Sequence, residues 1–97
     1  MTKRHLPPTH PGEILQEELT ERGISISQFS RDTRLPISRA RLMMKRQRPV
    51  TSDVALRLER YLGASAQFWM NLQIAYDLAT AKQDFGERII HEVSPAA

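Results

Sequence analysis

The chain has 97 residues, of which 40% are hydrophobic and 26% charged, so it forms one small globular domain with little room for a second. It contains no cysteine, which excludes disulfides, thiolate metal sites and cysteine nucleophiles and suits a reducing cytoplasm, where we expect the protein to work. No apolar run approaches the roughly 20 residues of a membrane-spanning helix, and the basic start lacks the apolar stretch of a signal peptide, so we expect no membrane partner.

Residues 1–9 are polar and contain two prolines, and we predict an irregular N-terminal arm there. The segment His10-Pro11-Gly12-Glu13 is typical of a helix start. Proline suits the first helical position, and an acid in the first turn complements the helix dipole. Because Gly23 can adopt the left-handed conformation that stops a helix, the first helix is predicted at about 11–22.

Two short helices around a tight break are predicted next. Ser25 or Ser27 can cap a helix that ends near Arg34, and Leu35-Pro36 breaks the chain because proline restricts the residue before it. The following helix is predicted at about 37–46, with Pro36 acceptable if it is the first helical residue. The pair has helix-turn-helix geometry. Because Arg34 occupies the turn, where glycine would be left-handed at no cost, we expect a slightly altered turn.

Two further helices complete the predicted core. Thr51 and Ser65 are good N-caps and Gly63 separates them, which predicts helices at about 52–62 and 66–82. The buried side of the former is expected to be Val54, Ala55, Leu58 and Leu62. The buried side of the latter is expected to be Phe68, Trp69, Leu72, Tyr76 and Ala79. Residues 10–82 thus form an all-α domain of five helices, followed by a tail at 83–97 in which residues 88–93 are either a short strand or a last helical turn.

The third predicted helix is strongly basic. Residues 31–48 contain seven arginines and lysines against one acid, whereas the other 79 residues contain seven basic and ten acidic groups. If Ala40, Met43 and Met44 face the core, the polar side chains point outward, where a helix can enter the major groove of B-DNA and arginine can bind guanine. Phosphate contacts are expected at the start of the second helix and beyond the third. The predicted DNA-binding residues are Gln28, Ser38, Arg39, Arg41, Lys45, Arg46 and Arg48, and the alternative is a charged face that is merely solvated.

The last predicted helix has a second apolar stripe, formed by Met70, Ile74 and Leu78, which faces away from Trp69. A helix that is apolar on two sides is usually covered on both. We expect a homodimer with two-fold symmetry, since two recognition helices can then meet half-sites one DNA turn apart. Alternatively, another protein covers the stripe, or the chain's own tail does so through residues such as Phe85 and Ile90.

Catalysis and metal binding are not expected. The histidines at positions 5, 10 and 91 lack the spacing of a zinc-binding helix, and the four glycines are scattered rather than gathered in a phosphate loop. We therefore predict no catalytic residues, no metal and no cofactor. The first helix exposes four glutamates, for which a solvated face is the simpler interpretation. The sharper one is an acidic surface for a basic, RNA-binding partner.

Several segments carry a resemblance to a known family, and they cover about residues 10–80. The segments are His10-Pro11-Gly12-Glu13-Ile14-Leu15, Ser27-Gln28-Phe29, Val50-Thr51-Ser52-Asp53-Val54-Ala55-Leu56-Arg57-Leu58, Phe68-Trp69-Met70-Asn71-Leu72-Gln73 and Tyr76-Asp77-Leu78. In order and spacing the sequence resembles the HigA-type, or VapI-like, antitoxins, a branch of the Xre/Cro helix-turn-helix family. The resemblance implies a Cro/lambda-repressor-like fold and a protein that neutralises a RelE-like, mRNA-cleaving toxin. It also implies that the protein represses its own operon by binding operator DNA as a dimer.

The third helix departs from that family, which usually has a small or capping residue near Pro36 and often Asn-Gly near Lys45-Arg46. The operator sequence therefore does not carry over. Two other functions stay open: a stand-alone Cro-type transcriptional regulator without a toxin, and a protein-only interaction module.

Overall fold

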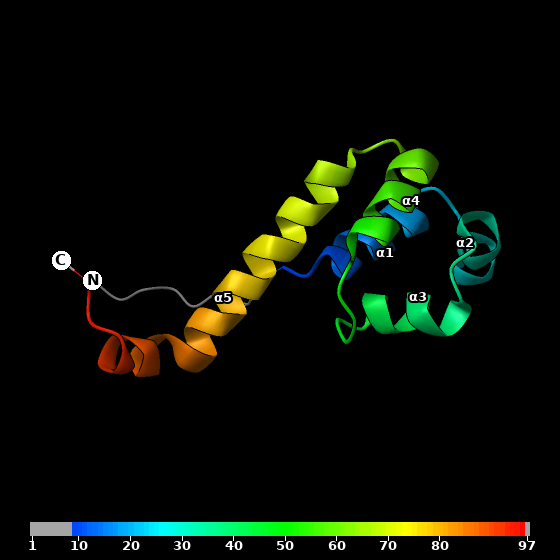
Figure 1. Ribbon diagram of the computed structural model, residues 1–97. Helices are drawn as coiled ribbons and strands as arrows, with labels where there is room; N and C mark the ends of the chain where they lie inside the picture. Colours follow the sequence, from blue (N-terminus) through cyan, green and yellow to red (C-terminus); the bar gives the residue numbers. More distant parts are fainter. Residues whose placement is uncertain (1–8, 97) are drawn as a thin grey trace.

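The computed structural model describes residues 9–96, so the predicted arm lies outside the described residues except for Thr9. Five α-helices are arranged with no strand between residues 9 and 96 (Figure 1), which confirms the all-α prediction. In the described part of the chain, no helix is both long and apolar enough to cross a membrane. The helices are α1 (Pro11–Glu21), α2 (Ile26–Thr33), α3 (Ile37–Met44), α4 (Ser52–Leu62) and α5 (Ala66–Glu92).

The helix starts follow from capping chemistry. His10 precedes α1 and caps it with its side chain, because its Nδ1 accepts from the backbone N–H of Gly12 at 2.9 Å. In return, the backbone N–H of His10 donates to the Glu13 carboxylate at 3.1 Å. Serine or threonine side chains cap α2, α4 and α5 in the same way. Only α3 lacks a side-chain cap. Pro36 is its N-cap rather than its first helical residue, because a ψ of 138° keeps it extended.

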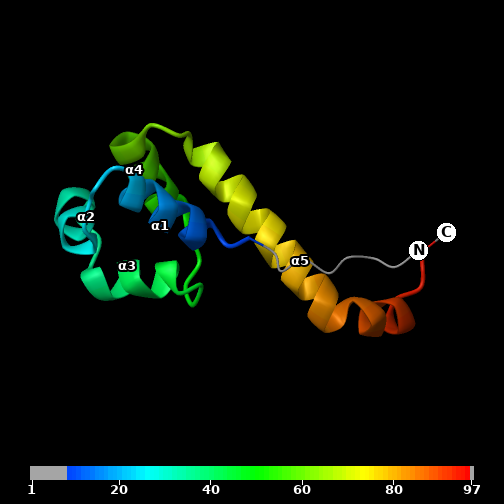
Figure 2. The ribbon, with the colours of Figure 1, turned by 180° about the vertical axis from the view of Figure 1, so that it is seen from behind.

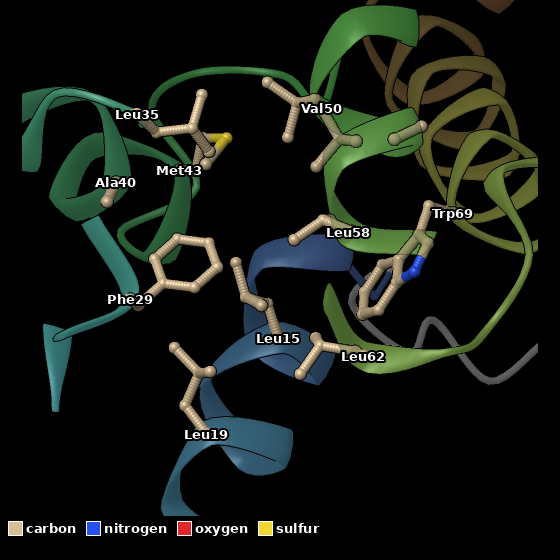
Figure 3. Close-up of a cluster of buried hydrophobic side chains, with 12 residues drawn as sticks. Leu15, Leu19, Phe29, Leu35, Ala40, Met43, Val50, Leu58, Leu62 and Trp69 are labelled. Carbon is tan, nitrogen blue, oxygen red and sulfur yellow. The ribbon is translucent and has the colours of Figure 1, made fainter. Parts of the chain in front are cut away.

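The core lies where α1 to α4 meet the first turns of α5. Figure 3 shows Phe29, Leu15 and Leu58 converging from three different helices, with Trp69 of α5 closing one side. The predicted stripe of α4 is buried throughout, as are Ala40 and Met43 of α3. The prediction is wrong for Phe68, which is 42% exposed. Phe68 lies about 100° from Trp69 around α5, on the side where the bundle leaves that helix uncovered.

The helix α5 is much longer than the sequence predicted. It runs to Glu92, so the predicted end at residue 82 is wrong, and residues 88–93 are a helical continuation rather than a strand. Gly86 is the one weak helix former near this point and costs only about 1 kcal/mol, which the surrounding residues overcome. In Figures 1 and 2 the far half of α5 projects away from the bundle. It leaves Ile74 and Leu78 of the second stripe 50% and 62% exposed, so the tail does not bury them.

Candidate nucleic-acid interface

The outer face of α3 is polar and basic. Ser38, Arg41 and Lys45 are exposed, whereas Ala40 and Met43 between them are fully buried. In Figures 1 and 2, α3 lies along one edge of the bundle. A single helix thus offers a hydroxyl and two cations on one side, which is the arrangement that a helix needs to donate to base edges and phosphates in a groove.

Arg39 differs from these three residues because it lies half-buried at the side of α3. Its Nη2 donates to the Thr51 hydroxyl at 3.1 Å, and its buried Nε has no partner among the described residues. Thr51 is also the N-cap of α4. Arg39 therefore ties α3 to the start of α4, a structural contact that the sequence pattern did not predict.

The turn between α2 and α3 is held by side chains of α2 and α4 that donate to its backbone carbonyls. Arg34 is left-handed at φ 61°, so it adopts the conformation that a turn glycine would adopt, despite its side chain. The Ser30 hydroxyl donates to the carbonyl of Leu35, and Arg57 of α4 donates to the carbonyl of Thr33 at 2.8 Å. These two donors fix the angle between α2 and α3. Neither was predicted, because neither lies on the outer face.

The loop from Lys45 to Val50 follows α3 and presents Arg46 and Arg48, which are both exposed. Arg46 adopts φ 64°, the conformation that asparagine or glycine would adopt with less strain. The far end of the loop is fastened to α5, where the backbone N–H of Val50 donates to Oε1 of the buried Gln73 at 2.7 Å. The other side of that amide donates to Asp77 at 2.9 Å.

His10 supports the same loop from the other side. His10 is 2% exposed, meets Tyr76 of α5 edge-on at 4.7 Å between ring centroids, and lines the same small hollow as Arg46 and Arg48. Burial lowers the pKa of His10 below its ordinary value of 6.5. Beside it, a Cβ on Gly12 would collide with the carbonyl oxygen of Met43, so α1 and α3 touch through bare backbone. The basic loop is therefore positioned by α1, α3 and α5 together.

The remaining predicted residues, one expected to bind DNA and three expected at an interface, lie on two different helices. Gln28 is exposed in the first turn of α2. Ile74 and Leu78 lie exposed on α5, whereas Met70 is half-buried and packs against the core. Gln73 was missed, although one signal was present: it follows the buried Trp69 by four residues on the core side of α5.

The exposed basic helix on a five-helix bundle defines a helix-turn-helix protein. No protein-family profile matches the chain. The chain is similar to virulence-associated protein I of Dichelobacter nodosus, with 46% identity over 83 residues that cover 84% of this chain and 77% of that protein. The antitoxin HigA of Pseudomonas aeruginosa, solved with the higBA promoter, has a TM-score of 0.88 and 44% identity over 93% of this chain and 99% of its own.

The antitoxin GraA in complex with its operator has a TM-score of 0.88 and 37% identity over 100% of this chain and 99% of its own. These neighbours are DNA-binding antitoxins rather than enzymes. The chain belongs to the HigA/VapI-like family of antitoxins within the Xre/Cro helix-turn-helix proteins.

Proposed function

We propose that this protein is the antitoxin of a type II toxin–antitoxin pair, which neutralises a RelE-like mRNA-cleaving toxin and represses its own operon as an operator-bound dimer. The observation that carries the DNA-binding half is the outer face of α3, where Ser38, Arg41 and Lys45 are exposed together. Similar chains of known structure were solved with operator or promoter DNA. A charge of one sign on one surface element favours a polyanionic partner.

Within this surface we assign different roles to the residues. Arg41 and Lys45, with Ser38, read base edges from α3, while Gln28, Arg46 and Arg48 contact phosphates from the flanking turns. Arg39 acts as a positioning residue, because its contact with Thr51 at 3.1 Å holds α3 against α4.

The assignment is tested with Arg41→Ala and Arg48→Ala, compared on operator and random DNA. Loss of a base contact in Arg41→Ala is expected to cost about 1–3 kcal/mol on the operator only. Loss of a phosphate contact in Arg48→Ala is expected to weaken both DNAs alike and to reduce the slope of log K against log salt by about one per contact. Arg88→Ala, at the far end of α5, is the matched control and should change neither. Equal effects of the first two variants on both DNAs would contradict the assigned roles.

The dimer is proposed to form through α5. Ile74 and Leu78 expose apolar surface, and Ile89 and Ile90 extend it at 49% and 76% exposure. Apolar patches of this kind mark association surfaces. Leu78→Glu should shift the mass measured by light scattering from dimer to monomer. Leu56→Glu on α4, where Leu56 is 60% exposed, is the control that should stay dimeric. A dimeric Leu78→Glu variant would exclude this interface.

The proposal that this protein neutralises a toxin is supported by its membership of the antitoxin family, and it is the first to be tested. The tagged chain is co-expressed with its neighbouring gene, followed by a pull-down and a growth assay. Co-purification together with rescue of growth is expected. If the neighbouring product is not toxic and no partner is retained, the stand-alone regulator replaces the antitoxin as the function.

A further inference from the structure

We infer that a hollow between α1 and the start of α5 is the surface that binds the toxin, and that it receives an apolar side chain from a basic protein surface. This inference rests on the proposed function. The hollow has a volume of about 260 Å³. That is below the roughly 300–1,000 Å³ of small-molecule sites, so it suits a side chain rather than a free ligand. It is lined by Ile14, Glu18, Arg22, Leu62, Ala64, Phe68 and Trp69.

Two aromatic side chains in the hollow leave interactions unmade in the free chain: one ring is partly exposed, and the other has a donor without an acceptor. Phe68 is 42% exposed and meets Trp69 edge-on at 5.2 Å between ring centroids. Trp69 is 1% exposed, and its indole Nε1 has no hydrogen-bond partner among the described residues. Figure 3 shows that nitrogen on the side of the ring away from Leu15 and Leu58. A buried donor without an acceptor is unfavourable, so a partner whose binding shifts the Trp69 ring enough to bring an acceptor to Nε1 would gain a hydrogen bond.

The rim of the hollow selects the charge of that partner. Between Pro11 and Glu21, α1 contains four glutamates and no basic residue. Glu18 lines the hollow itself, whereas Glu17 and Glu21 are exposed on the adjoining face of α1, around a neighbouring depression. Arg22, the nearby cation, is already engaged, since it pairs with Glu18 at 3.0 Å and donates to the carbonyl of Leu62 at 3.0 Å. The net surface is acidic and complements a protein that must itself bind RNA phosphates.

The hollow also lies apart from the proposed DNA surface. In Figure 1 the connection between α4 and α5 lies at the opposite side of the bundle from α3. A toxin bound here leaves the outer face of α3 free, so toxin and operator can be held at the same time.

The single tryptophan provides the test, because a ¹⁵N-labelled chain shows one indole N–H resonance. On addition of the unlabelled product of the neighbouring gene, that resonance is expected to move. Phe68→Ala and the double change Glu17→Lys, Glu21→Lys are each expected to weaken toxin binding at least about tenfold. Operator affinity should stay unchanged, which shows that the variants are folded. Leu56→Ala and Asp84→Lys are the matched apolar and acidic controls, since both residues are exposed and neither lines the hollow.

The outcomes separate the two proposals. If no complex forms with the wild-type chain, the proposed function and this inference both fail. If a complex forms while the indole resonance stays in place, or if Phe68→Ala and the charge reversals bind as tightly as the controls, only this inference fails. A resonance that moves with the concentration of the chain alone would assign the hollow to a second copy instead and would overturn the inference.

Discussion

Gln73 joins the long helix α5 to the basic loop, and replacing it with methionine tests that connection. Methionine has a similar length and can fill the same space, but it cannot accept the backbone N–H of Val50. Val50 is 1% exposed and Gln73 is 4% exposed, so water cannot readily replace the lost acceptor. Leaving a buried donor unsatisfied costs about 1–3 kcal/mol. The second partner, Asp77, is exposed and can be hydrated, so it adds little.

Urea unfolding of Gln73→Met should therefore give a free energy of unfolding lower by about 1–3 kcal/mol, with a fall in Tm of at least about 4 °C for a domain of this size. The matched control is Gln67→Met on the same helix. Gln67 also donates to a residue four positions on, Asn71 at 2.9 Å, but it is exposed and touches no backbone amide. The control should change stability by no more than about 0.5 kcal/mol. Equal effects of the two substitutions would refute the importance of the Val50 contact.

Three further predictions concern the elements around the same loop. Gly12→Ala places a methyl group against the backbone oxygen of Met43 and should destabilise the protein by about 1–3 kcal/mol in urea unfolding. Arg46→Gly removes a side chain from a left-handed residue, so the free energy of unfolding should rise by up to about 1 kcal/mol. Operator binding should weaken at the same time, with a shallower salt dependence, because a cation near the phosphates is lost. If stability and operator affinity rose or fell together, the separate structural and DNA-binding roles of Arg46 would be contradicted. Burial lowers the pKa of His10, so the unfolded state takes up a proton first as pH falls below about 6.5. Stability in urea unfolding should therefore be full above that pH and decrease as the pH falls from there towards the lower pKa of the folded state, and His10→Asn, which keeps a capping acceptor without titrating, should flatten the decrease.

Local signals predicted most of the helical framework correctly. The segment from His10 to Glu13 predicted the start of α1 because capping depends on neighbouring residues alone. Likewise, the stripe from Val54 to Leu62 predicted the buried side of α4, since helical periodicity is a property of the sequence. The exposed positions of Arg41 and Lys45 follow from the same periodicity.

The remaining features depend on which elements meet in space. Arg39 lies between the buried and exposed sides of α3, so only the position of Thr51 decides whether it is free or bound. Gln73 is buried because a backbone amide 23 residues away needs an acceptor at that point. The length of α5 was underestimated because apolar residues near its end resembled a strand, whereas continued helical hydrogen bonding keeps them in the helix.

The polar contacts around α3 show how a helix with a weak start of its own is held in one orientation. Pro36 provides no side-chain cap, and both Arg34 and Arg46 at its two ends are left-handed, so local preferences alone would leave α3 poorly defined. Its position is instead determined from outside: Arg57 holds the preceding turn, Arg39 is bound by the cap of α4, and the following loop is fastened to α5. If the proposed dimer forms through α5, the helix that fastens each basic loop would also set the spacing between the two copies of α3.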